Sequence, residues 1–269
     1  MKSTPNYFYL FSLVLLTLLS CREEEIIVPT LVNLSNNSIY ELLPANSNVA
    51  ILSTDDLVVN PSFRLVNGEG ASDNGDFVIK GTILQTSKVL RFANGASRSI
   101  RVQVTAETES FEQIWEIKVN QFVGTYPTVI SPSFGNNEEM PRNFGMDNGN
   151  VSPDLVIMDV PDETVSMVIA MVDLDDGNSF HWVLWNIPPD KVKFQPGESS
   201  TLGGNIVVGD NSFGTGYTGP FPPTTHNYQI TVYFLSDSLN LNPDEFLTII
   251  PAMTGKIIAQ ASIVGKYSP

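Results

Sequence analysis

The sequence has little of three residue types, since it contains one cysteine, two histidines and few basic residues. Cys21 has no partner within the chain, which excludes an intrachain disulfide, so apolar cores have to stabilise the fold. The 14 Lys and Arg residues face 29 Asp and Glu residues, giving a net charge of −15 at pH 7. Such a surface repels phosphate backbones, so we expect no nucleic-acid partner.

The N-terminus carries the longest apolar run. In residues 1–20 the only charge is Lys2, and the run from Tyr7 to Leu19 is shorter than the roughly 20 residues of a membrane-spanning helix. It therefore predicts an export signal peptide. Leu18-Leu19-Ser20-Cys21 resembles the lipobox of bacterial lipoproteins. That resemblance implies cleavage before Cys21, lipid attachment to Cys21 and a membrane partner through the lipid.

The predicted location is the bacterial cell envelope, with the protein lipid-anchored at the outer membrane or cell surface. The alternative is a plain secreted protein in which Cys21 is incidental. Residues 21–35 are predicted to form an acidic tether. Glu23, Glu24 and Glu25 in it resemble surface-export signals of some Gram-negative lipoproteins, or they simply keep the tether solvated.

The mature length of roughly 250 residues favours two domains over one core. We place the joint near residues 120–134, where Gly124 and Pro127 interrupt the pattern. The sequence thus divides into a domain at residues 36–122 and a domain at residues 127–269.

Residues 36–122 are typical of short β-strands. Ile100, Val102 and Val104 alternate with polar neighbours, and residues 111–119 alternate less strictly. Short strands at regular spacing with turn-rich loops between them predict an antiparallel β-sandwich. Roughly residues 36–120 resemble one bacterial cadherin repeat, on the segments "ELLPANSNVAILSTDD", "FRLVNGEGASDNGDFVIKGTILQT" and "SRSIRVQVTAETESFEQIWEIKV".

The cadherin resemblance implies calcium as a cofactor. Its ligands would fall on Glu41, Asp55 and Asp56, because calcium prefers carboxylate and carbonyl oxygens. The sequence departs from the family pattern at Leu57 and at Ala106-Glu107, where acidic residues are usual. The alternative is a β-sandwich that serves as a spacer.

The second domain is expected to contain three long strands. Residues 165–173 are almost wholly apolar and predict a strand buried on both faces. Residues 181–187 and 228–236 predict two more. Asn242, with Pro243 after it, is typical of a helix start and predicts a helix to about Met253. The segment 256–267 reads as helix, strand or both.

Candidate polar residues lie at the ends of these strands. Strand ends meet at one rim of a sheet, where ligand sites are common. The loop "GPFPPTTHNY" is rigid because prolines restrict φ, and Gly219 allows close backbone approach. These features predict a preformed pocket that holds His181 and His226.

The domain at residues 127–269 resembles the phosphatidylethanolamine-binding protein family, in its bacterial Raf-kinase-inhibitor-like branch. The resemblance rests on "MPRNFGMDNGNVSPDL", "VDLDD", "HWVLWNIP", "NSFGTGYTGPFPPTTHNY" and "AMTGKIIAQASIVGKYS". It implies a mainly β fold, a β-sandwich with a few short helices, and a pocket for phosphate, acetate or a phospholipid head group. The residues that match the family pocket are Asp173, Asp175, His181, Tyr217, Gly219, Pro222, Pro223, His226 and Tyr228.

The function that these patterns favour is a lipid-anchored binding protein for a small anion or phosphorylated head group. Three alternatives stay open. The first is a hydrolase that uses histidine-activated water, although neither a G-x-S-x-G nor an H-E-x-x-H motif occurs and we expect no catalysis. The second is a metal centre of the two histidines and Asp173. The third is calcium-dependent adhesion or a scaffold role through the N-terminal domain.

Overall fold

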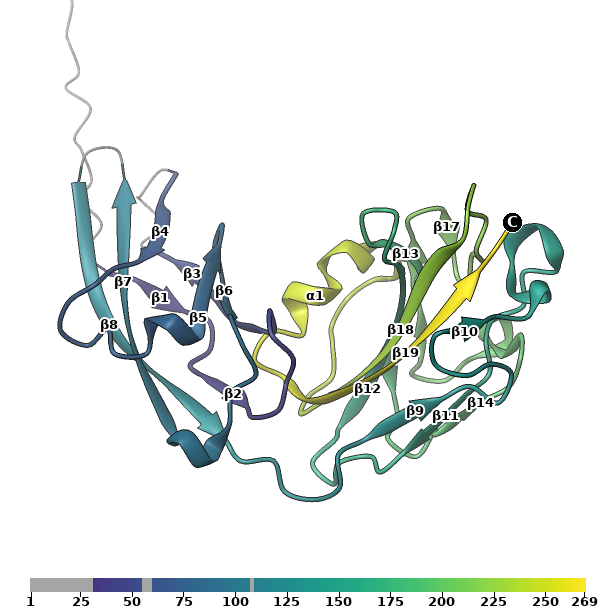
Figure 1. Cartoon of the computed structure of the whole chain (residues 1–269), viewed down its shortest axis with the longest axis horizontal. Helices are drawn as coiled ribbons and strands as arrows, with labels where there is room; N and C mark the ends of the chain where they lie inside the picture. The colour runs from purple at the N-terminus through teal and green to yellow at the C-terminus, as the bar shows by residue number, and fades with distance from the viewer. Residues whose placement is uncertain (1–30, 55–59, 107–108) are drawn as a thin grey trace, which may run out of the picture.

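The computed structural model describes residues 31–54, 60–106 and 109–269, and these form two β-rich parts (Figure 1). The N-terminal part ends at Asn120 and the C-terminal part begins at Thr128, with no helix or strand between them. In the described ranges, no helix has the length and apolar character needed to cross a membrane. Residues 1–20 and Cys21, the predicted signal peptide and lipid site, lie outside the described residues.

The N-terminal part consists of two four-stranded sheets. In order across the sheet, the first contains β1 (Asn33–Leu34), β3 (Asn48–Ser53), β6 (Ile83–Thr86) and β5 (Phe77–Lys80), and the second contains β2 (Ser38–Tyr40), β8 (Glu109–Asn120), β7 (Ser97–Ala106) and β4 (Ser62–Leu65). Leu52 and Leu84 of one sheet share a buried cluster with Val102 and Ile117 of the other. The two sheets therefore enclose a common apolar core. Two short 3₁₀ helices, η1 (Asn74–Asp76) and η2 (Phe92–Asn94), lie in the connections.

The alternating segments of the sequence lie in β7 and β8, and β7 pairs along its whole length with residues 109–118 of β8. One pairing differs from the expected antiparallel arrangement, because β2 runs parallel to β8. The chain crosses from the first sheet to the second between β1 and β2, and β2 then pairs with the edge of β8 in the parallel direction.

The C-terminal part is built on a six-stranded sheet. Its order is β10 (Glu138–Glu139), β19 (Ile257–Tyr267), β18 (His226–Leu235), β12 (Ser166–Asp173), β13 (Ser179–Ile187) and β15 (Val207–Val208). A second sheet contains β14 (Lys193–Phe194), β11 (Leu155–Met158) and β9 (Thr128–Ile130). A hairpin of β16 (Asp210–Asn211) and β17 (Gly214–Thr215) follows β15, and η3 (Arg142–Phe144), η4 (Met146–Asn148) and η5 (Glu198–Thr201) are short 3₁₀ helices.

Both faces of the six-stranded sheet are covered. One face shares a large apolar cluster with the three-stranded sheet, and Trp182 lies in it with no exposed surface. The other face packs against the helical segment that follows residue 242, with Trp185 at its centre. The central strand β12 is consequently buried on both sides, as its apolar sequence predicts.

The helix predicted from Asn242 to Met253 is less regular than expected. It consists of a 3₁₀ segment, η6 (Pro243–Thr248), followed by one α-helical turn, α1 (Ile249–Ala252). Asn242 and Glu245 form the capping box that starts it, and Glu245 has non-helical dihedral angles inside it. The ambiguous segment 256–267 is the strand β19.

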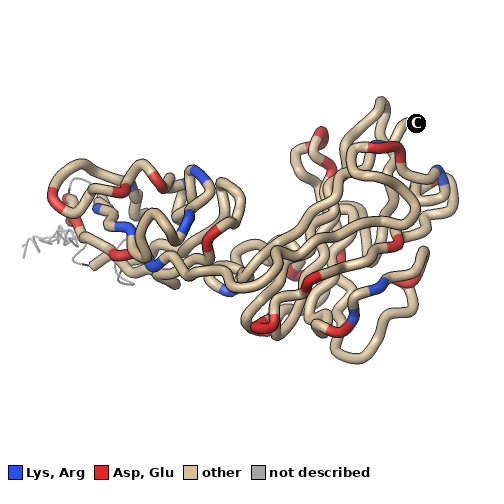
Figure 2. The backbone as a smooth tube through the Cα atoms, turned by 60° about the horizontal axis from the view of Figure 1, so that its bottom comes forward, with Lys and Arg blue, Asp and Glu red and all other residues tan. Residues whose placement is uncertain are grey.

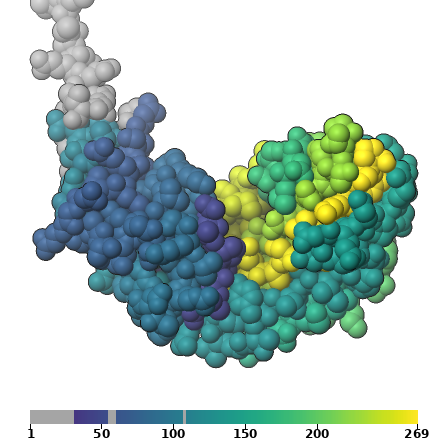
Figure 3. Space-filling model, in the orientation of Figure 1, coloured from purple at the N-terminus to yellow at the C-terminus, as the bar shows by residue number. Residues whose placement is uncertain are grey.

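The two parts touch at the start of β19. Ile257 packs against apolar residues of both parts. The Tyr40 hydroxyl donates to Glu163 at 3.2 Å, and the Tyr126 hydroxyl donates to the Leu42 carbonyl at 3.4 Å. Beyond this contact, Figure 3 shows an open recess between the two parts.

Candidate functional site

Strand register brings the candidate residues together at one end of the six-stranded sheet. Asp173, the last residue of β12, pairs with Ser179 of β13 on one side and Tyr228 of β18 on the other. His181 and His226 each lie two residues from those partners. His181 and His226, which are 45 positions apart in the chain, therefore flank the carboxylate of Asp173.

His181 occupies an irregular position in β13. The register passes from Met171 opposite Trp182 to Val172 opposite Phe180, which leaves His181 as the extra residue of a β-bulge. Trp182 belongs to the cluster that faces the three-stranded sheet, whereas Phe180 packs against the cluster on the opposite face, which faces the helical segment. Residues two apart normally share a face, so the bulge reverses the alternation and re-aims the histidine.

The ring of His181 is buried and tied to the neighbouring loop. Its Nδ1 donates to the Thr218 carbonyl at 2.9 Å, while the Thr218 N–H donates to the His181 carbonyl at 2.9 Å. Burial lowers the pKa of His181, and the Thr218 carbonyl opposes that shift without cancelling it. The neutral ring with its proton on Nδ1 therefore has Nε2 as its acceptor nitrogen.

Asp173 is the buried centre of the site. Its Oδ2 accepts from His226 Nδ1 at 2.8 Å, and its Oδ1 accepts from the Asp175 N–H at 2.9 Å. Burial raises the pKa of the Tyr228 hydroxyl, and its hydrogen bond to Asp173 raises it further, so the phenol stays protonated. The carboxylate thereby orients His226 and leaves Nε2 as the ring nitrogen that can meet a ligand.

A cavity of about 210 Å³ opens over these groups. Six of the predicted residues line it: Asp173, His181, Pro222, Pro223, His226 and Tyr228. Three further lining residues, Asp176, Phe213 and Phe221, were not among the predicted ligands. Asp176 directly follows the predicted carboxylates and was available as a signal. Phe213 and Phe221 lie within the motif quoted for the family resemblance, but the motif alone does not show that their rings reach the cavity.

The other predicted pocket residues lie beside the cavity. Asp175 accepts from the backbone and side-chain N–H groups of Asn227, at 2.7 and 2.9 Å. These bonds lower the pKa of Asp175 and tie the end of β12 to the start of β18. The carboxylate therefore holds two strands together.

Tyr217 and Gly219 support the loop from behind. The Tyr217 hydroxyl donates to the Phe144 carbonyl at 2.9 Å, and the Gly219 N–H donates to Asn150 at 2.7 Å. A Cβ on Gly219 would lie 2.1 Å from the Phe144 carbonyl oxygen, so only glycine fits this approach. The Gly219 N–H is thus engaged with Asn150 and does not face a ligand.

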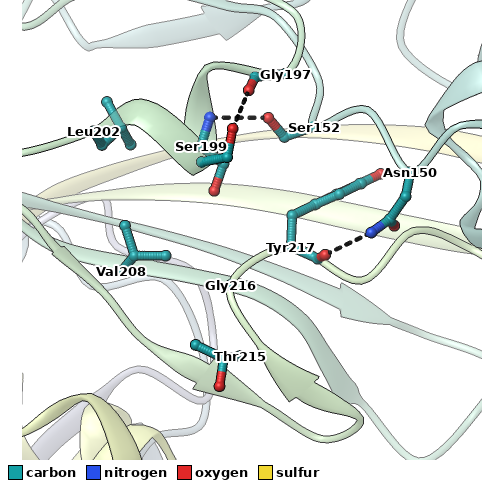
Figure 4. Close-up of a pocket in the computed structure, with 10 residues that line it drawn as sticks. Asn150, Ser152, Gly197, Ser199, Leu202, Val208, Thr215, Gly216 and Tyr217 are labelled. Carbon is teal, nitrogen blue, oxygen red and sulfur yellow. Dashed lines mark hydrogen bonds between the residues drawn. The ribbon is translucent and has the colours of Figure 1, made fainter.

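Tyr217 borders a second cavity of about 360 Å³ (Figure 4). The polar groups that line this cavity are hydrogen-bonded to one another and to buried Trp182. The Ser199 N–H donates to Ser152 Oγ at 3.3 Å, and Trp182 Nε1 donates to Ser199 Oγ at 2.9 Å. Asn150 Nδ2 donates to the Tyr217 carbonyl at 3.1 Å. With these groups already paired, the cavity offers less to a ligand than the histidine site.

Glu41, the described member of the predicted calcium ligands, has both carboxylate oxygens engaged. They accept from the Phe92 N–H at 2.8 Å and the Phe122 N–H at 3.2 Å. Asp55 and Asp56 lie outside the described residues. Across the described residues, no group of three or more His, Cys, Asp and Glu side chains is arranged to hold a metal ion.

The fold and the site together define a class: a mainly β protein with a preformed polar pocket at one end of its central sheet. Comparison with known proteins identifies the family of the C-terminal part. Residues 130–268 match the phosphatidylethanolamine-binding protein family. The chain is 38% identical to the UPF0098 protein of Aquifex aeolicus over 155 residues, which cover 54% of this chain and 90% of that protein. The chain therefore belongs to the phosphatidylethanolamine-binding protein family.

Two solved structures are also similar to the chain. A homologue of phosphatidylethanolamine-binding proteins from Chlamydia trachomatis is 27% identical with a TM-score of 0.49, and the match covers 54% of this chain and 98% of that one. Drosophila N-cadherin is 10% identical with a TM-score of 0.26, covering 88% of this chain and 66% of that one. The cadherin resemblance of residues 36–122 stays a prediction at that level of similarity.

Proposed function

We propose that this chain is a lipid-anchored, extracytoplasmic binding protein whose histidine pocket receives a small anion or a phosphorylated head group. The observation that carries the proposal is the Asp173–His226 pair at the base of the 210 Å³ cavity. A carboxylate on Nδ1 orients the imidazole, and a protonated Nε2 then donates a charge-assisted hydrogen bond to an anionic oxygen.

The charges around the pocket bear on how an anion enters. Asp173 and Asp176 both line it, and acidic residues are distributed over both parts of the chain (Figure 2). An anion is therefore accepted with a proton, carried either on an imidazole or on the ligand itself. Binding is expected to strengthen as the pH falls, because a proton on an imidazole or on the ligand reduces the charge repulsion with these carboxylates.

A titration of the whole chain followed by histidine-ring NMR tests the proposal directly, since the chain has only two histidines. Inorganic phosphate and then phosphoethanolamine are added at pH 6. We expect both rings to shift together and to saturate at one ligand per chain. Rings that stay unmoved at millimolar phosphate would contradict the anion pocket.

Variants separate the pocket from nonspecific charge effects. His226→Ala is expected to abolish the response, because it removes the oriented donor. Asp176→Asn is expected to tighten phosphate binding by removing a negative charge from the rim. Asp190→Asn is the matched control, since this exposed residue follows β13 at the end opposite His181 and lines no part of the cavity.

The anchored location rests on the sequence of residues 1–21. Metabolic labelling of bacteria with a fatty-acid analogue tests it. The native chain should incorporate label, and Cys21→Ser should not. Label on the Cys21→Ser variant, or none on the native chain, would contradict lipid attachment at this position.

We propose that the N-terminal part, with its resemblance to a cadherin repeat, acts as a spacer. Glu41 supports this role, since it joins η2 to the segment after β8 through two backbone N–H groups. The contact between the parts involves Ile257, ten residues before Tyr267 on β19, which pairs with His226. At about 3.3 Å per residue, the pocket lies roughly 33 Å from that contact and stays open.

A further inference from the structure

The second cavity, of about 360 Å³ beside Tyr217, differs from the histidine site because, among the described residues, no charged side chain lines it. Its polar side chains are hydroxyls and one amide: Asn150, Ser152, Ser199, Ser200, Thr215 and Tyr217. Burial raises the pKa of the Tyr217 hydroxyl, so this group is uncharged as well. An ionic ligand would lose its hydration there without meeting an opposite charge, so the lining favours an uncharged polar ligand.

Two buried serine hydroxyls in this cavity still have a hydrogen to donate. Ser152 and Ser199 are 2% and 5% exposed. Ser152 Oγ accepts from the Ser199 N–H at 3.3 Å, and Ser199 Oγ accepts from Trp182 Nε1 at 2.9 Å. Both oxygens thus act as acceptors, and no bond between described residues uses either hydroxyl hydrogen. Because a buried donor is stable only with an acceptor, these hydroxyls call for an oxygen inside the cavity.

Three exposed polar residues, Asn150, Ser200 and Thr215, surround the entrance of the cavity. The Asn150 amide is fixed, since its Nδ2 donates to the Tyr217 carbonyl at 3.1 Å and its Oδ1 accepts from the Gly219 N–H at 2.7 Å. An amide has two N–H donors and two acceptor lone pairs, so Asn150 keeps one of each for a ligand. A donor beside an acceptor suits a hydroxyl group, which both donates and accepts.

The opposite side of the cavity is apolar. Figure 4 shows Leu202 and Val208, both half-buried, across the cavity from Asn150 and Tyr217. A pyranose sugar carries hydroxyls on its rim and C–H groups on its faces, so it can contact both sides at once. A cavity of roughly 150 Å³ accommodates benzene, so 360 Å³ has room for a ligand about twice that size, such as one hexopyranose unit.

We propose that this cavity binds an uncharged hexopyranose sugar. The sugar hydroxyls contact the serine and Asn150 side, and one C–H face packs against Leu202 and Val208.

The sugar site is separate from the histidine site, although one segment borders both. Tyr217 and Gly219 bond to Asn150 at the sugar cavity. Thr218 between them bonds to His181, through its N–H and its carbonyl, both at 2.9 Å. The two cavities share no lining residue. Sugar binding should therefore not depend on the anion pocket.

Indole NMR of the whole chain tests the proposal, because Trp182 donates to Ser199 at the cavity and the chain has only three tryptophans. D-glucose, D-galactose and N-acetyl-D-glucosamine are added singly at pH 7. At least one should shift the Trp182 N–H signal and saturate at one sugar per chain, with a Kd of about 1 mM or below. Trp115, in the N-terminal part, should not respond. No Trp182 shift with any of the three at roughly 20 mM, or an equal shift of Trp115, would overturn the proposal.

Variants locate the bound sugar. Ser152→Ala should weaken sugar binding about fivefold, the loss of one hydrogen bond, and Val208→Phe should weaken it at least tenfold by filling the cavity. Ser166→Ala is the matched control, since Ser166 is 3% exposed but does not line this cavity, and it should leave the affinity unchanged. His226→Ala should abolish the phosphate response and leave sugar binding intact. Sugar binding that survives Val208→Phe, or that is lost in His226→Ala, would overturn the assignment to this cavity.

Discussion

Each part of the chain pairs a buried ionisable side chain with a second one, Arg98 with Asp76 and Asp173 with His226, and the two pairs differ in what they leave unpaired. In the N-terminal part, Arg98 is 4% exposed and donates to Asp76 at 3.0 Å. Three of its other four N–H bonds donate to the carbonyls of Gly95, Ser97 and Arg91. The guanidinium is thus paired by the protein itself, and it stabilises the loops around η1 and η2.

In the C-terminal part, the bonds described for His226 engage Nδ1 with Asp173 and leave Nε2 at a cavity. A buried polar group whose partners are all internal serves the fold. In the proposed anion pocket, a buried carboxylate instead orients a ring whose other nitrogen is available to a ligand. The two pairs therefore differ in one respect. The described bonds of Arg98 all go to other groups of the protein, whereas those of His226 leave its Nε2 for the proposed ligand.

The largest expected effect tests the structural pair. Arg98→Met should lower the free energy of unfolding by about 3 kcal/mol, since it removes four hydrogen bonds and one partner of Asp76. Urea unfolding measures this. Lys88→Met is the control, because Lys88 also pairs with Asp76 but is 60% exposed, and its loss should cost below about 1 kcal/mol. Phosphate affinity should stay unchanged in both variants, and a change would show that the two parts are coupled.

The next effect concerns the binding pair. Asp173→Asn should weaken phosphate binding roughly thirtyfold, about 2 kcal/mol, because it removes the carboxylate that accepts from His226 Nδ1 and orients the ring. Calorimetry at pH 6 gives the affinity. Asp175→Asn is the comparison, since Asp175 bonds to Asn227 outside the cavity and should change the affinity by less. Equal losses in the two variants would contradict a special role for Asp173.

A smaller effect tests whether the two parts unfold together. Ile257→Ala should lower stability by about 1–2 kcal/mol, since a half-buried isoleucine loses contacts with both apolar clusters. Calorimetric scans should show one transition in the native chain and broader or separate transitions in the variant. Tyr40→Phe removes only the exposed hydrogen bond to Glu163 and should cost below about 1 kcal/mol. Two separate transitions already present in the native chain would contradict the coupling.

The smallest effect is a pH dependence. Because the pKa of His181 is lower in the folded chain than its ordinary value near 6.5, the unfolded chain binds the proton more readily. The contribution of His181 to stability is therefore complete above about pH 6.5 and falls with the pH until the folded pKa is passed. Urea unfolding at pH 7.5 and 5.5 should show a smaller decrease for His181→Gln than for the native chain. An identical decrease would contradict the lowered pKa.

Much of the C-terminal fold was predictable because strand patterns are local. The apolar run of residues 165–173 became the buried β12, and Asn242 and Pro243 marked a helical start. The helical segment has about the predicted extent, but most of it is 3₁₀, because the capping box describes only its first turn. The choice of strand for residues 257–267 depended on pairing with β18, which the local pattern does not contain.

The pocket was predictable in part. His181, His226 and Asp173 were recognisable from their places at strand ends and from the family motifs. Asp175, Tyr217 and Gly219 belong to the same motifs, but their bonds to Asn227, Phe144 and Asn150 place them beside the cavity. Motif membership does not distinguish a residue that touches a ligand from one that supports the loop.

The sequence by itself determined the mainly β character, the apolar strands of the central sheet, the acidic balance and the family of the C-terminal part, because these depend on composition and local order. Only the tertiary structure decided which side chains meet. The bulge at His181, the register that places Asp173 beside Tyr228, and the hairpin that brings Phe213 to the cavity all arise from pairing between distant segments. Strand pairing brings residues that are distant in the sequence into contact, and these contacts form the site.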